Sequence, residues 1–161
     1  MDEPELRAAR LKERVYVTFT SLAVVLALRA HHESAEEAAT TLAIAVLGTV
    51  LAVFVADVVS HVAVHAVLPT RREMSEMARI SFGALGVLVL PAIFLGLALA
   101  DRWDVDRALR ASTIALVAAL VAIGYLAVRR LRLPAWQRFV VLLSEFALGA
   151  LVVAVELLAH G

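Results

Sequence analysis

Ionisable side chains stand inside long apolar segments of this chain at Asp57, His61, His65, Glu145 and Glu156. Such a group costs about 2.5 to 3.5 kcal/mol near the centre of a membrane helix, so it normally faces a partner inside a bundle. Carboxylates and imidazoles are ligands for Fe(II), Mn(II) and Zn(II), and imidazole titrates near neutral pH. These residue types therefore point to an ion site or a proton relay.

Asp57, His61 and His65 follow one another at intervals of four residues. On an α-helix a step of four residues turns by about 40° and rises by about 6 Å, so the three side chains share one face. The rise from Asp57 to His65 is about 12 Å, too long for all three to bind one ion at ligand distances of about 2 Å. At most two neighbours share a metal ion, and another helix must supply a further ligand.

The composition is that of a chain embedded in lipid. Hydrophobic residues make up 62% of the sequence, against about 45 to 50% in soluble domains, and several runs approach the roughly 20 residues that cross a bilayer. A soluble helical bundle is therefore the weaker interpretation. Basic and acidic residues balance at 15 each, which gives no basis for nucleic-acid binding, and the absence of cysteine excludes thiolate sites and disulfides.

We predict an all-α fold, a single membrane domain over residues 1–161 with five transmembrane helices. The expected spans are 15–32, 38–68, 79–100, 108–129 and 136–159. Ser34 with Glu37, and Thr70 with Glu73, have the spacing of a capping box and should begin the second and third helices. Pro91 should kink the third helix.

The orientation follows from the basic residues. Four precede the first span, three lie between the second and third, and four lie between the fourth and fifth, which makes eleven of the 15. Basic loops stay cytoplasmic, so the amino terminus should be inside and the carboxyl terminus outside. Tyr16 and Trp136 then lie at the inner interface and Trp103 at the outer one. We expect a multi-pass protein of the cell inner (plasma) membrane.

The deepest polar residues of different helices are expected at similar depths in the bilayer. Measured from the cytoplasmic ends at about 1.5 Å per residue, His61 lies about 10 Å deep, Asp57 about 16 Å and Glu145 about 12 to 15 Å. If the second and fifth helices touch, Glu145 meets Asp57 and His61. Thr20 and Ser21 of the first helix reach a comparable depth and offer hydroxyl groups. We therefore predict a metal or proton path of Asp57, His61 and Glu145, supported by Thr20 and Ser21.

Ser60, His65 and Glu156 are further supporting residues of this path. His65 lies near the inner interface, where we interpret it as reaching toward the headgroups, and Glu156 lies near the outer end of the fifth helix in contact with water. Ser60 and His61 are adjacent rather than stacked, so no nucleophile has an oriented base, and we do not expect an enzyme. Small residues that allow close helix approach are Gly83, Gly86 and Gly149.

The second, third and fifth spans resemble the vacuolar iron transporter family. Asp57-Val-Val-Ser60 stands where that family commonly has Glu-Tyr-Val-Ser, and Ser81-Phe82 with Gly86 and Pro91 is similar to its third-helix spacing. The turn 124–132 and the segment around Gly149 look like its closing helices. The resemblance implies a homodimer that exchanges divalent iron or manganese for protons, with Asp57 in place of the family's glutamate.

Three features of that family have no counterpart here. Its first helix carries an Asp-Gly pair and its second a methionine, and many members have a cytosolic metal-collecting segment where residues 69–79 only make a turn. Only Asp57 is carried over by motif.

From the polar residues and the resemblance together, we expect a transporter or channel for divalent metal ions (Fe, Mn or Zn as substrate) or protons, with no permanently bound cofactor. The alternative is a non-transporting scaffold or accessory subunit of a membrane protein partner, in which the polar cluster is structural.

Overall fold

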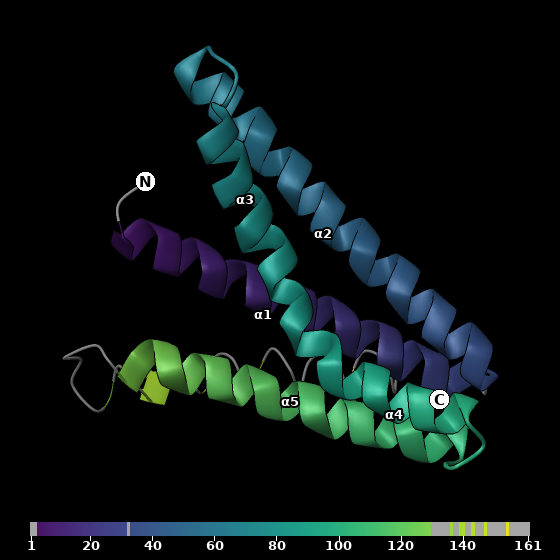
Figure 1. Ribbon diagram of the computed structural model, residues 1–161. Coiled ribbons are helices and arrows are strands. Elements are labelled where there is room, and N and C mark those ends of the chain that lie inside the picture. Colours follow the sequence, from purple (N-terminus) through teal and green to yellow (C-terminus); the bar gives the residue numbers. More distant parts are fainter. Residues whose placement is uncertain are drawn as a thin grey trace.

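The computed structural model in Figure 1 describes residues 3–31, 33–129, 136, 139, 140, 143, 147 and 154. Every element in this part of the chain is a helix, and these residues form no strand. The predicted all-α class is confirmed for them.

Long rods make up the described fold. They are α1 (Glu3–His31), α2 (Ala35–His65), α3 (Arg71–Gly83), the 3-10 helix η1 (Ala84–Leu88), α4 (Val89–Leu99) and α5 (Val105–Arg129). α1 and α5 run side by side, while α2 leaves the end of α1 at an angle, so that the two open like a V (Figure 1). α3, η1 and α4 form one bent rod that starts beside the far end of α2 and crosses α1 (Figure 1). α1 therefore lies at the centre and contacts α2, α3, η1 and α5.

The beginnings of α2 and α3 are set by local hydrogen bonds. Ser34 Oγ accepts from Glu37 N at 3.2 Å, while the Glu37 carboxylate accepts from Ser34 N at 3.1 Å. Thr70 and Glu73 repeat the arrangement at α3, where Thr70 N donates to Glu73 Oε2 at 2.7 Å. Each box satisfies amide groups that would otherwise lack a partner at a helix start. Both predicted capping boxes are confirmed.

α2 ends at His65, three residues before the predicted end at Leu68. Ala66 adopts the left-handed conformation with φ 56° and donates its N–H to Val62 O at 2.8 Å, which closes the last turn. Pro69 disfavours helical conformation at Leu68, so the chain turns before it.

The third rod is irregular one turn before Pro91. η1 occupies Ala84–Leu88, and α4 resumes at Val89. Pro91 has no N–H to donate to Val87 O, and its ring would clash with that carbonyl in a regular α-helix. The backbone instead adopts the tighter 3-10 conformation over this segment. Where we predicted a kink near Pro91, the structure has a 3-10 segment over the residues that precede the proline.

Apolar side chains of α1 form the middle of the core. Leu22 and Val25 are fully buried and pack in one cluster with Val46 of α2 and Leu116 of α5. Hydroxyl groups in these helices turn inward to their own backbone: Ser21 Oγ donates to Val17 O at 2.6 Å, and Ser112 Oγ to Ala108 O at 2.8 Å. Such back-bonding satisfies a hydroxyl without water, as an apolar surrounding requires.

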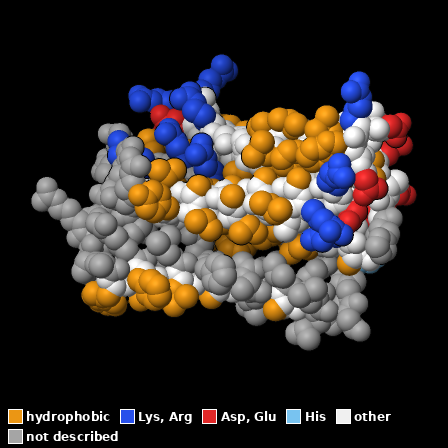
Figure 2. Space-filling view, turned by 90° about the horizontal axis from the view of Figure 1, so that it is seen from below, with side chains coloured by type: hydrophobic (Ala, Val, Ile, Leu, Met, Phe, Trp, Pro, Cys, Tyr) orange, Lys and Arg blue, Asp and Glu red, His pale blue; other side chains and the backbone are white. Residues whose placement is uncertain are grey.

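Three helical rods of the described part are long and apolar enough to cross a membrane: Ala35–His65, Arg71–Leu99 and Val105–Ala127. Their apolar side chains point outward as well as inward, as on α2, where Ile44, Leu51 and Val59 are exposed. Figure 2 shows an apolar band between ends that carry the charged side chains. These helices are those of a membrane-embedded protein. The predicted fifth span, residues 136–159, lies outside the continuously described part of the chain.

Candidate functional site

The face of α2 that carries Asp57 opens onto a cavity of about 290 Å³. α3 closes it from the other side with Met77 and Ile80, and α1 contributes Ala9. From α2 itself the cavity is lined by Asp57, Ser60, His61, Val64 and His65. The structure thus places four of the polar residues selected from the sequence in one cavity, because helical spacing puts them on one side of α2 and the turn 66–70 folds α3 back against that side.

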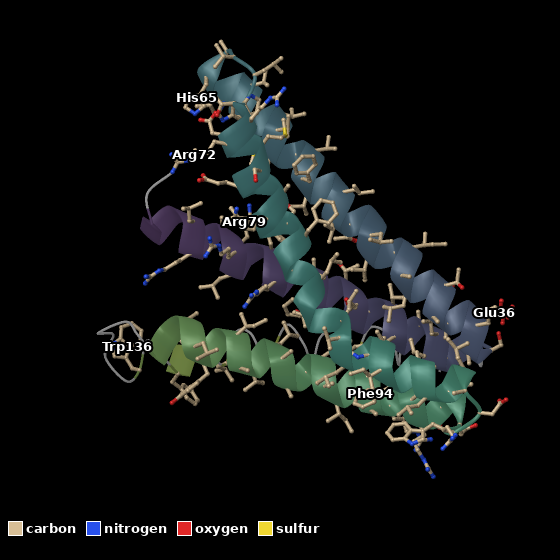
Figure 3. The ribbon with its side chains drawn as sticks, in the orientation of Figure 1. Glu36, His65, Arg72, Arg79, Phe94 and Trp136 are labelled. Atoms are coloured by element: carbon tan, nitrogen blue, oxygen red, sulfur yellow. The ribbon has the colours of Figure 1, made fainter. Side chains whose placement is uncertain are left out.

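His61 and His65 lie one turn apart, with ring centroids at 4.6 Å and ring planes inclined by 48°. Both rings also line a second, smaller cavity of about 130 Å³, which α3 completes with Glu73, Glu76 and Met77. His65 lies in the last turn of α2, at the end where α2 and α3 meet (Figure 3). The two imidazoles therefore stand between the Asp57 cavity and a pair of carboxylates at the helix ends.

Glu73 is held in its charged form at this end. Its Oε2 accepts hydrogen bonds from Thr70 Oγ1 and Thr70 N, both at 2.7 Å, and these bonds lower the pKa of Glu73 below the ordinary value of 4.5. Desolvation opposes the change, and the positive charge that His61 and His65 can carry adds a smaller effect in the same direction as the hydrogen bonds. Glu73 precedes the predicted third span, residues 79–100.

α1 brings a positive charge to the Asp57 side. Burial lowers the pKa of Lys12, but the hydrogen bond and charge of Glu13, together with the charges of Asp57 and Tyr16, outweigh it and raise that pKa above 10.5. Lys12 Nζ lies 3.2 Å from Glu13 Oε1. Lys12 follows Ala9, which lines the cavity, by about one helical turn. The ammonium therefore remains charged next to Glu13, and the charge of Asp57 contributes to this.

The hydroxyl groups expected from the first helix lie elsewhere. At the level of the cavity α1 presents Ala9, and Ser21 follows it by 12 residues, about 18 Å along the helix. Ser21 is fully buried, and its hydroxyl donates a hydrogen bond to Val17 O. Within the described residues, neither Thr20 nor Ser21 lines the Asp57 cavity.

Four ionisable residues near this site were not predicted as site residues from the sequence: Lys12, Glu13, Glu73 and Glu76. Glu73 was already explained as a helix cap, and the charged flank of residues 7–14 looks uniformly solvated. A signal for Glu13 did exist. Glu13, Val17 and Ser21 are four residues apart, so the carboxylate continues the buried stripe of α1, and it is only 1% exposed.

Glu145 and Glu156 lie outside the described residues, so the predicted third ligand has no position here. Among the residues that the structure describes, no group of three or more His, Cys, Asp or Glu side chains is arranged to hold a metal ion. Asp57 with His61 supplies at most two ligands, fewer than a tetrahedral divalent site requires. The described part of the chain therefore contains two of the three residues predicted for the ion site, Asp57 and His61.

Gly83 and Gly86 make no close contact with another helix in the described part of the chain. Among these residues, a Cβ added at either position would meet nothing within 4 Å, and both positions are exposed. Their predicted role in close helix approach stays a prediction.

Comparisons of the chain with protein-family models, with curated proteins and with solved structures give no match. The resemblance to vacuolar iron transporters stays a prediction.

Proposed function

We propose that this protein is a small multi-pass membrane protein that passes protons or divalent cations through a path beginning at Asp57 and His61. The observation that carries the proposal is the cavity of about 290 Å³ that these two residues line together on a helix apolar enough to cross a membrane. A carboxylate and an imidazole on such a helix are costly unless they are used or paired. An open cavity gives them access to an ion.

The proposed topology has five spans, with the amino terminus in the cytoplasm and the carboxyl terminus outside, in the inner (plasma) membrane. Its support is the charge of the two ends. Segments 6–14 and 71–79 contain seven basic and three acidic residues, whereas segments 29–37 and 101–110 contain four basic and six acidic residues. Figure 2 shows a gathering of Lys and Arg side chains at one end and most of the visible acidic side chains at the other. The more basic end stays cytoplasmic.

For a divalent cation as cargo, Asp57 provides the anionic ligand, His61 a nitrogen ligand, and Glu145 of the fifth span the third group. For protons, His61 and His65 are the more direct carriers, because their rings lie 4.6 Å apart between Asp57 and the carboxylates of α3. The proton version needs no further ligand. It is the version that the described residues support better.

Flux in proteoliposomes tests the proposal. The wild-type protein should dissipate a pH gradient, or admit Fe(II), Mn(II) or Zn(II), at a rate that Asp57→Asn reduces to background. Asp101→Asn is a matched control, because Asp101 is exposed in a loop with φ 53°, a conformation that Asn also adopts readily. Background flux for the wild type with every ion would refute the proposal.

A scaffold or accessory subunit, alone or as a homodimer, is the second candidate. The observation that favours it is the exposed apolar side of α2, where Ile44, Leu51 and Val59 offer a large surface to lipid or to another membrane helix. This function predicts that Asp57→Asn lowers thermal stability or retention of a membrane partner, with no flux to lose.

A further inference from the structure

A set of exposed arginines lies outside the candidate path, at the end of α1 and α3 that the proposed topology places in the cytoplasm. We call it the basic surface and define it by Arg7, Arg10, Arg14, Arg71, Arg72 and Arg79, all of which are exposed. Lys12 is excluded from it because its ammonium is paired with Glu13.

Both arms of the basic surface end at the beginning of an apolar segment. Arg14 directly precedes Val15, the first residue of the first predicted span, and Arg79 directly precedes Ile80. Figure 3 shows Arg72 and Arg79 on the side of α3 that is turned toward the amino-terminal half of α1, and the two helices are in contact. Ala9, next to Arg10, and Ile80, next to Arg79, line the same cavity, so these two arginines stand at a similar level on the two helices.

Acidic side chains compensate little of this charge. Arg72 Nε lies 3.4 Å from Glu76 Oε1 in an exposed pair, and Arg7 has an interaction of its own. Arg10, Arg14, Arg71 and Arg79 make no ion pair with any residue in the described part of the chain. At the opposite end, by contrast, Asp106 holds Arg110 at 2.6 Å and lies 4.0 Å from Arg29.

We propose that the basic surface binds the phosphate headgroup of an anionic phospholipid in the cytoplasmic leaflet. A guanidinium group presents parallel N–H donors that match two phosphate oxygens, and lipid phosphates lie at the level where these side chains end. Basic residues next to a membrane segment gain about 1 kcal/mol each from an anionic leaflet. The partner is a lipid rather than a soluble polyanion, because the apolar segments that adjoin Arg14 and Arg79 hold the surface against the bilayer.

The test compares lipid binding by the purified full chain and by two double variants. Native mass spectrometry from detergent measures how much phosphatidylglycerol and phosphatidylcholine each protein retains. Arg10→Gln with Arg79→Gln should lose about fivefold in phosphatidylglycerol affinity per arginine, which corresponds to about 1 kcal/mol each. The control, Arg102→Gln with Arg107→Gln, removes two exposed charges from the opposite end and should leave retention unchanged.

Several outcomes would overturn this assignment. They are equal retention of both lipids by the wild type, equal losses in the two double variants, and displacement of phosphatidylglycerol by glycerol 3-phosphate, which would indicate a site for soluble phosphate. Circular dichroism shows whether each variant keeps its helices, and a single variant, Arg79→Gln, serves if the double variant unfolds. Because lipid retention is measured without flux, the result stands whether or not the protein transports an ion.

Discussion

Lys12 Nζ lies 3.2 Å from Glu13 Oε1, and this contact joins a lysine whose side chain is 54% exposed to a carboxylate that is 1% exposed. Neither Glu13 oxygen has a well-aligned hydrogen bond in the described structure. A buried carboxylate with so little support depends on the nearest positive charge. Lys12 therefore does two things at once: it balances Glu13 and places a cation on the Asp57 side of α1.

Removal of Lys12 should destabilise the protein because it leaves Glu13 buried without its partner. Exposed pairs contribute about 0 to 1 kcal/mol and breaking a buried pair costs about 3 to 5 kcal/mol, so Lys12→Met should cost about 2 kcal/mol. Thermal unfolding in a zwitterionic detergent measures the change. Adding Glu13→Gln should recover most of the loss, and Arg10→Met on the same helix should change little. A double variant as unstable as Lys12→Met would contradict the dependence of Glu13 on Lys12.

Loss of a capping box should weaken the helix that it begins. Thr70→Ala removes the hydroxyl that accepts from Glu73 N and should cost about 1 kcal/mol, and Ser34→Ala should do the same at α2. Thr41→Ala, an exposed threonine within α2, is the control and should show no such loss. Thermal unfolding of the three variants in one detergent checks this.

The Thr70 cap should also show in the pH dependence of stability. Its hydrogen bonds lower the pKa of Glu73 in the folded protein, so their contribution is present above the ordinary value of 4.5 and is lost as the pH falls below it. The wild type should therefore lose more stability than Thr70→Ala between neutral pH and a pH of about 3.5. Parallel unfolding curves for the two proteins over that range would show that the Glu73 hydrogen bonds contribute nothing.

The two imidazoles should differ in a proton-flux assay. Both rings line the two cavities, but His61 is half-buried one turn from Asp57, whereas His65 lies in the exposed last turn of α2. His61→Gln should reduce flux to background, and His65→Gln should lower it only partly, since water reaches the end of the helix. Wild-type flux in His61→Gln would remove His61 from the path.

Substitutions at Gly83 and Gly86 test whether these positions pack within one chain or between the two chains of a dimer. No described residue lies within 4 Å of an added Cβ at either position, and replacing a helical glycine gains about 0.5 to 1 kcal/mol, so monomer stability should hold or rise. If the proposed homodimer uses this side, Gly86→Leu should shift the mass measured by light scattering in detergent from dimer to monomer. Gly96→Ala, also open but on α4, is the control.

Local patterns in the sequence were enough to predict much of the fold. Capping boxes, the break at Pro69 and the irregularity before Pro91 depend on residues within one or two turns. They can therefore be predicted without knowing which helices pack against them. The common face of Asp57, His61 and His65 follows in the same way from a four-residue spacing. Polar residues could therefore be assigned to a helix and to one of its sides.

Tertiary structure alone decided which groups meet across helices. The angle at which α1 and α2 open, and the turn that folds α3 back, set the level at which residues face one another. Ala9 and Lys12, rather than Thr20 and Ser21, stand at the level of Asp57, and Glu73 and Glu76 reach the two histidines. Helical periodicity assigns a side chain to one side of its own helix, whereas the crossing angle and the shift between helices come from the packing of the whole bundle.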